Sequence, residues 1–204
     1  MSKVHLTGAS SPRASDFIDH VTPHELELGL DEILRSPPIE GRLELLVRRP
    51  AVGEREVLDE GELDPAQGLV GDRWGAGGGA NPDVQLTLMN ARVVALLARA
   101  RERWPLAGDQ LYVDLDLSRA NLPPGTRLGI GSATIEVTAE PHTGCKKFAA
   151  RFGLEAVRFV STPVGKSNCF RGINARVVSA GTIRRGDAVR KLEQAEQASE
   201  APLA

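Results

Sequence analysis

Residues 111–140 read LYVDLDLSRANLPPGTRLGIGSATIEVTAE, and their order of apolar and polar residues favours one fold class over others. Apolar and polar residues alternate in LYVDLDL, which starts at Leu111, and again in ATIEVTAE, which starts at Ala133. Alternation over about four to eight residues is typical of a β-strand with one buried face, and Pro and Gly between such segments are typical of turns. The stretch therefore predicts two short strands.

Four further segments show the same alternation and are bounded by Gly, Pro or Asp. They are RLELLVRRP from Arg42, REVLD from Arg55, VQLTLM from Val84 and INARVVSAG from Ile173. Many short strands with few helices are typical of a barrel or a mixed sheet. The pattern predicts a small mixed or antiparallel barrel with helices at its ends, not a doubly wound parallel sheet.

Two segments have the signals of helices. TPHELELGLDEILRSPP carries a capping box, with Thr22 as N-cap and Glu25 three residues later, and the prolines at 37–38 end it. NARVVALLARARERWP has Asn90 as N-cap and apolar residues at helical spacing as far as Trp104, before Pro105. We expect one helix in each segment, and a third after Cys145.

Composition excludes several classes of function. The 204 residues carry a formal net charge of −2, with an isoelectric point near 6.1, so no overall basic field indicates binding to nucleic acid or an anionic membrane. Two cysteines are too few for a disulfide framework. The sequence shows neither a signal peptide nor an apolar run of about 18 residues. These features predict a cytoplasmic protein with no membrane or nucleic-acid partner.

A glycine-rich stretch, GLVGDRWGAGGGANP at 68–82, contains the spacing G-x-G-x-x-[GA] of dinucleotide-binding loops. That motif works when it opens a helix whose N-terminus holds a pyrophosphate, whereas here Asn81 and Pro82 lead into a predicted strand. We therefore expect a glycine loop and not a nucleotide site. Asp72 and Arg73 stay candidates for the edge of a binding site.

The segment EPHTGCKKFAARFG, at 140–153, places Cys145 beside two lysines at the expected start of a helix. If Thr143 caps this helix, Cys145 lies in its first turn, where free N–H groups and the helix dipole favour a thiolate. Burial as a small core residue is the alternative, and charge and position leave both readings open. His142 should precede the helix because of Pro141, and neither a four-ligand zinc site nor a protease-like pair is indicated.

The second cysteine lies in GKSNCFRGINARVV. Cys169 precedes Phe170 and a predicted strand, which favours structural burial. Arg171 offers a planar fork that suits phosphate or carboxylate, and Gly172 allows close approach of the backbone. An ordinary surface arginine is the alternative for Arg171.

Several blocks together resemble the MOSC family, named for the C-terminal domain of molybdenum cofactor sulfurases. They are GLVGDRW, VQLTLMN, GDQLYVDLDLSRANLPPGTRLGIGSATIEV, HTGCKKFAARFGLEAVRFV and RGINARVVSAGTIRRGDAV, within about residues 40–192. The resemblance implies a closed β-barrel, similar to the β-barrel of pyruvate kinase, with peripheral helices. It also implies three parts: an N-terminal arm and helix at 1–40, the barrel domain at 41–192 and a C-terminal tail at 193–204.

The resemblance implies a function as well. The single cysteine of the family maps onto Cys145, which is expected to be the catalytic residue that carries sulfur or ligates molybdenum, and molybdenum cofactor is the expected ligand. From their charge or position, the residues expected to bind it are Lys146, Arg171, Gly172, Arg73, Asp72, His142 and Thr143. Pyridoxal phosphate is not expected on this chain, because the roughly 40 residues before the barrel are too few for a sulfurase domain.

Three readings of function stay open. The chain binds the cofactor or transfers sulfur, with a cysteine desulfurase or a molybdoenzyme as partner; or it is a molybdenum-dependent reductase of N-hydroxylated compounds; or it is a non-catalytic module that binds an anion or another protein. Many relatives have Gly-Glu-Asn-Leu where this chain has Gly108, Asp109, Gln110 and Leu111. In this chain the acidic side chain, Asp109, is therefore shorter than in those relatives, and the amide side chain, Gln110, is longer.

Overall fold

The structure is a computed structural model, and it describes residues 20–77, 80–143 and 146–193. Most of the predicted arm and tail, and both Gly144 and Cys145, lie outside the described residues. Within them, seven strands close into a barrel in the order β11-β7-β8-β9-β5-β6-β1, and β1 pairs back with β11. The strands are β1 (Glu40–Arg48), β5 (Leu86–Asn90), β6 (Leu111–Asp114), β7 (Arg127–Ile130), β8 (Ala133–Val137), β9 (Ile173–Ser179) and β11 (Ala188–Lys191).

The barrel is mixed, because β5 and β6 pair in parallel while the other neighbours pair antiparallel. Strand β2 (Glu56–Leu58) pairs antiparallel with the C-terminal end of β1. A smaller sheet has the order β10-β3-β4, with β3 (Glu60–Asp64), β4 (Gly68–Leu69) and β10 (Gly181–Arg184). The predicted fold class, a closed barrel with peripheral helices, is confirmed. All six predicted strands are present, and β3, β4, β7, β10 and β11 are additional.

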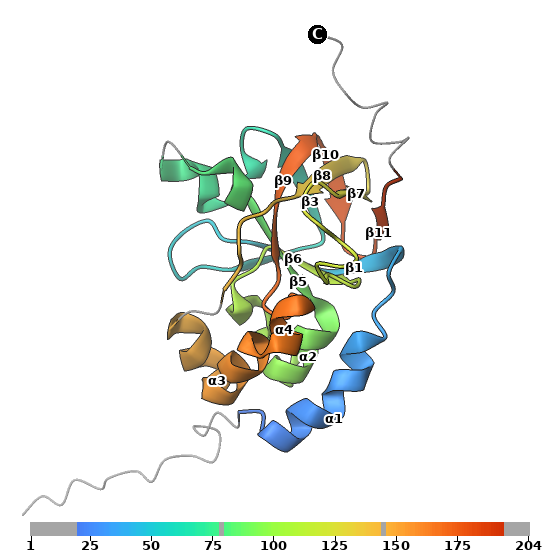
Figure 1. Ribbon diagram of the computed structural model, residues 1–204. Coiled ribbons are helices and arrows are strands. Elements are labelled where there is room, and N and C mark those ends of the chain that lie inside the picture. Colours follow the sequence, from blue (N-terminus) through green and yellow to red (C-terminus); the bar gives the residue numbers. More distant parts are fainter. Residues whose placement is uncertain (1–19, 78–79, 144–145, 194–204) are drawn as a thin grey trace, which may run out of the picture.

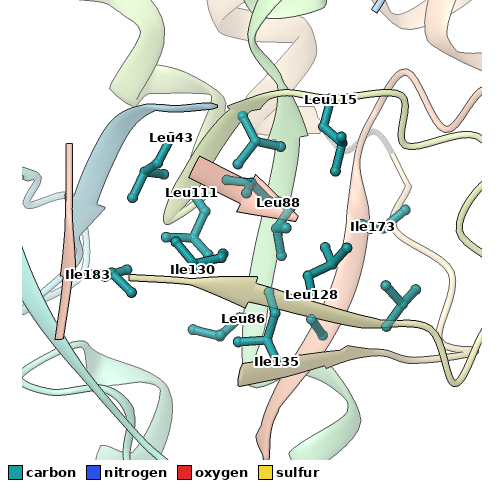
Figure 2. Close-up of a cluster of buried hydrophobic side chains, with 14 of the residues drawn as sticks. Leu43, Leu86, Leu88, Leu111, Leu115, Leu128, Ile130, Ile135, Ile173 and Ile183 are labelled. Atoms are coloured by element: carbon teal, nitrogen blue, oxygen red, sulfur yellow. The ribbon is translucent and has the colours of Figure 1, made fainter. Parts of the chain in front are cut away.

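Alternation along the strands sends apolar side chains into two cores. One face fills the barrel, where Leu43, Leu88 and Leu111 are completely buried with Leu and Ile residues of the other strands (Figure 2). Residues next to them in sequence, among them Met89 and Tyr112, point the other way and pack beneath the helices. Because β5 and β6 pair in parallel, a helical crossover connects them, and both faces of these two strands are buried.

The α-helices of the described residues, four in number, gather at one end of the barrel (Figure 1). They are α1 (Pro23–Leu34), α2 (Ala91–Ala98), α3 (Lys146–Ser161) and α4 (Pro163–Ser167). The capping box of α1 is confirmed: the Glu25 amide donates to the Thr22 hydroxyl at 3.3 Å, and the Thr22 amide donates to the Glu25 carboxylate at 2.8 Å. No helix among the described residues is long and apolar enough to cross a membrane.

The prediction of one helix over 90–105 is wrong in its length. Asn90 caps α2 as expected, but the helix ends at Ala98, and Arg99 has the left-handed φ of 61°. The chain then forms the 3-10 helix η4 (Arg101–Ala107), which contains Pro105 instead of ending before it. The turn allows the Trp104 carbonyl to accept a hydrogen bond from the buried Tyr112 hydroxyl at 2.8 Å, a tertiary contact that the helical spacing does not encode.

The glycine-rich stretch forms β4 and the 3-10 helices η2 (Arg73–Gly77) and η3 (Pro82–Val84), with residues 78–79 outside the described part. No α-helix starts within its described residues. The stretch thus lacks the strand-to-helix turn on which a dinucleotide-binding loop depends.

Candidate functional site

A cavity of about 380 Å³ opens between the helices and the barrel. His142 and Thr143 line it from the segment before α3, Lys166 from α4, and Arg171 and Gly172 from the turn that leads into β9. Four of the predicted site residues, His142, Thr143, Arg171 and Gly172, are therefore brought together from two distant parts of the chain. The volume lies in the range of about 300 to 1,000 Å³ that is usual for small-molecule sites.

Arg171 is buried, in contrast to the alternative of a surface arginine. Its side chain is only 9% exposed, and its Nη1 donates to both carboxylate oxygens of Asp109 at 3.1 and 2.9 Å. Its Nη2 donates to the Ala107 carbonyl, and the guanidinium lies 4.8 Å from the ring centre of Phe148. Its Nε is buried and has no hydrogen-bond partner among the described residues. That N–H is therefore a buried donor that no described residue satisfies.

His142 precedes α3, as predicted, and lies beside the same pair. Its Nδ1 is 3.5 Å from the Asp109 carboxylate, is buried, and has no hydrogen-bond partner in the described part of the chain. Burial lowers the pKa of His142 to about 4; Asp109 opposes the shift, while the positive charges of Arg171 and Arg49 add to it. His142 is therefore neutral at pH 7 and offers one donor and one acceptor nitrogen.

The charges that line the cavity are mostly positive. Among the described lining residues, Arg119, Lys166 and Arg171 are cationic and Glu140 is acidic, and Asp109 balances the charge of Arg171. A net positive charge therefore remains at the cavity, where the Arg171 Nε and the His142 Nδ1 have no partner among the described residues, and this combination favours an anionic ligand that accepts hydrogen bonds.

Gly172 allows a close approach of the backbone, as predicted, and the group that approaches it is a protein carbonyl. Its φ is 110°, and a Cβ at this position would lie 2.2 Å from the Leu88 carbonyl oxygen and 3.1 Å from the His142 Nδ1. Only glycine fits here, because any side chain would push β9 away from β5 and also crowd the imidazole.

The other predicted site residues lie apart from the lining of the cavity. The Asp72 side chain is fully buried, and its oxygens accept from the Arg49 side chain and from the amides of Arg49 and Trp74. Arg73 is exposed at the start of η2, and Lys146 is exposed as the first residue of α3. Cys145 lies outside the described residues, so its place in a first helical turn, and the cofactor contacts of Asp72, Arg73 and Lys146, stay predictions.

Cys169 is buried, as its position before Phe170 indicated, and its thiol lines the cavity. Burial raises the pKa of Cys169, and the nearby charge of Arg119 opposes the shift. The thiol is thus protonated at neutral pH and is a poor nucleophile.

Asp109 is the important residue of the site that sequence reasoning did not select. Its side chain is completely buried and holds Arg171 from 62 positions away in the chain. Gln110 is buried as well, and its oxygen accepts from the amide and the hydroxyl of Thr87. In the Gly-Asp-Gln-Leu segment, Asp109 therefore orients Arg171, and the Gln110 side chain joins the start of β6 to β5. The departure of this segment from Gly-Glu-Asn-Leu was the sequence feature that could have pointed to Asp109.

The described residues contain no group of three His, Cys, Asp or Glu side chains that could hold a metal ion. The unpartnered Arg171 Nε and the surrounding cations do fit the anionic part of a molybdenum-pterin cofactor.

The described residues thus form a mixed seven-stranded barrel with helices at one end and a cavity between the two. The family model of the MOSC domain matches residues 80–190, more than half of the 204 residues, and the chain belongs to the MOSC domain family. The comparison with curated proteins gave no match.

Solved structures support the same fold. The chain is 18% identical to the YuaD protein from Bacillus subtilis, with a TM-score of 0.56 over 76% of this chain and 98% of that one. It is 20% identical to YiiM from Escherichia coli, with a TM-score of 0.51 over 75% and 70% of the two chains. It is 14% identical to YiiM from Geobacillus stearothermophilus, with a TM-score of 0.51 over 76% of each chain. These identities establish likeness of fold alone.

Proposed function

We propose that this MOSC domain binds a molybdenum-pterin cofactor in the cavity beside His142 and Arg171, with Cys145 as the reacting thiol. The observation that carries the proposal is the buried Arg171 Nε, a charged donor without a partner among the described residues, at a cavity whose described charged residues are three cations and one carboxylate. Burying such a donor unsatisfied is costly, and an anionic ligand removes that cost.

Each residue of the cavity has a separate task in this proposal. Asp109 fixes the guanidinium of Arg171, so that Nε donates to the ligand without a loss of side-chain freedom on binding. Arg119 and Lys166 supply further positive charge at the cavity. The neutral His142 donates or accepts at Nδ1. When bound, the cofactor supplies metal redox chemistry or accepts sulfur, and a thiolate is a suitable ligand for its soft metal.

Cys145 follows the cavity residue Thr143 by two positions and precedes the exposed Lys146. As a sulfur carrier, its thiolate attacks the terminal sulfur of a persulfide on a donor protein. The donor's S–S bond breaks, the donor leaves as a thiolate, and a persulfide forms on Cys145 without net oxidation. A cysteine desulfurase is the class of partner that produces such a donor.

The proposal is tested on full-length protein purified from a host that makes molybdenum cofactor. The fluorescence of the oxidised pterin, the molybdenum content and the mass of the Cys145 peptide are measured per mole of protein. Arg171→Lys keeps a positive charge for Asp109 but removes the Nε donor, so it should retain several-fold less pterin. Lys166→Gln should also retain less, and Arg190→Gln, which removes a charge paired with Glu40 outside the lining of the cavity, should match the wild type.

The pattern of the three readouts separates the readings of function. Pterin with stoichiometric molybdenum supports the reductase reading, and pterin with a persulfide on Cys145 supports sulfur transfer. Absence of pterin from the wild-type protein, or equal retention in all the variants, would contradict the proposed site.

A further inference from the structure

A groove of about 320 Å³ lies between α1 and the turn from α3 to α4, at the end of the barrel where the helices gather (Figure 1). Its apolar lining consists of Pro23, Leu26, Leu30, Phe159 and Val164. Phe159 is half-buried and stacks on the buried Phe170 with the ring centres 5.1 Å apart, and Val164 is 44% exposed. The groove therefore exposes apolar surface that is continuous with the core beneath the helices.

An exposed leucine lies beside this groove. Leu154 is 66% exposed, directly precedes the groove residue Glu155, and lies one helical turn before Arg158, which also lines the groove. Water contact with a large apolar side chain and with an apolar groove is unfavourable, and burying one in the other removes both contacts. One face of the molecule thus carries an apolar projection next to an apolar hollow.

The charges at the groove have both signs. Arg158 lines it from α3, has a side chain that is 71% exposed, and pairs with Glu155 on its own helix. Glu27 lines it from α1, is exposed, and forms no ion pair within the described part of the chain. A cation on one wall of an apolar groove and an acid on the other wall make the face complementary to a second copy of itself, related by a two-fold axis.

We propose that this face, here called the α1–α3 groove, binds a second copy of the chain to form a two-fold symmetric dimer. Leu154 of each copy enters the groove of the other, and Arg158 of each copy faces Glu27 of the other. Because α1 has 12 residues, the groove is only about 18 Å long. Interfaces at the small end of the usual range are weak, and we expect dissociation constants of about tens to hundreds of micromolar.

The α1–α3 groove is distinct from the cavity at Arg171. No described residue lines both, although Val160 and Gly165, from the same part of the chain as Phe159 and Val164, line the cavity. The inference does not depend on the proposed function. Variants of Leu154 and Arg158 should therefore retain as much pterin as the wild type does.

The test is sedimentation velocity of the full chain at concentrations from about 1 µM to 1 mM. Leu154→Asp and Arg158→Glu should each weaken self-association by about tenfold or more, because the first places a charge in the apolar contact and the second opposes two acids. Arg190→Glu is the control: it also reverses an exposed arginine and breaks an exposed ion pair, here with Glu40, and should change association less than about twofold. Leu154→Asp should unfold at nearly the wild-type urea midpoint, because the side chain is mostly exposed.

A charge exchange tests the predicted contact between the two copies. Glu27→Lys alone should weaken association as Arg158→Glu does, because it opposes two cations. An equimolar mixture of the two variants should associate nearly as well as the wild type, since each copy then offers the charge that the other lacks. Variants that have merely lost structure would not recover in a mixture.

Several results would overturn the inference. They are a wild-type chain that stays monomeric at the highest concentration, association that is unchanged in Leu154→Asp and Arg158→Glu, and a mixture that associates no better than its components. Association that appears only in a variant lacking residues 1–19 would assign the groove to that segment instead of a second copy. Each of these results leaves the proposed function standing, because none of the altered residues lines the cavity at Arg171.

Discussion

Replacement of Asp109 by Asn tests how the cavity holds its arginine. Asp109 is completely buried, and both of its oxygens accept from the Arg171 Nη1. The Asn side chain has nearly the same size but no charge, so Arg171 would stay buried without a counter-charge. Removal of one partner from a buried ion pair costs about 3 to 5 kcal/mol, and we expect the lower end because the Asn oxygen still accepts one hydrogen bond.

The assay is urea unfolding followed by tryptophan fluorescence, since Trp104 is buried against the core. Asp109→Asn should lower the midpoint at an unchanged slope. Asp114→Asn is the matched control, because Asp114 pairs with Arg92 through two hydrogen bonds at a site where both side chains are roughly one-quarter exposed. The control should lose at most about 1 kcal/mol. A similarly small loss in Asp109→Asn would refute the buried-pair argument.

Three further predictions concern residues of the cavity. The pKa of His142 is lowered to about 4 from 6.5, so the unfolded chain binds one more proton than the folded chain between these pH values. The free energy of unfolding should therefore decrease by up to about 3 kcal/mol as the pH falls from 6.5 to 4. Acid unfolding of His142→Gln should lack this part of the loss. Gly172→Ala should destabilise the fold by at least about 2 kcal/mol in urea unfolding, because the new Cβ meets the Leu88 carbonyl, and a loss below about 0.5 kcal/mol would contradict this reading. Cys145 should be alkylated at pH 7 much faster than Cys169, whose burial raises its pKa, and comparable rates by peptide mass spectrometry would contradict an activated thiol.

The strands that could be predicted are those with enough apolar positions to show alternation. Residues 42–48 and 84–89 each place several large apolar side chains on alternate positions, and both form strands of the barrel. Strands β7, with the sequence RLGI, and β11, with AVRK, have only four residues each, and glycine or basic residues interrupt the pattern. They are held by pairing with neighbours already in the barrel, and local sequence does not contain that pairing.

The site could be predicted in part for a similar reason. His142 and Arg171 were selected from local chemistry, and the structure places both at one cavity. The pairing of Arg171 with Asp109 joins residues 62 positions apart, and it buries and orients the guanidinium that was predicted to bind an anion. Asp72 was selected as a possible ligand contact because it adjoins a glycine loop, yet its carboxylate is used by Arg49. No local pattern encodes either long-range pair.

In the proposed function, the cavity beside His142 and Arg171 is the cofactor site of this MOSC domain. Its most direct test is a crystal structure of protein purified from a cofactor-producing host, with anomalous diffraction recorded at the molybdenum edge. We expect density for a bound pterin within the cavity lined by His142, Thr143 and Arg171, and an anomalous peak there if the metal is retained. Pterin or molybdenum bound at any other place on the chain would show that this cavity is not the cofactor site.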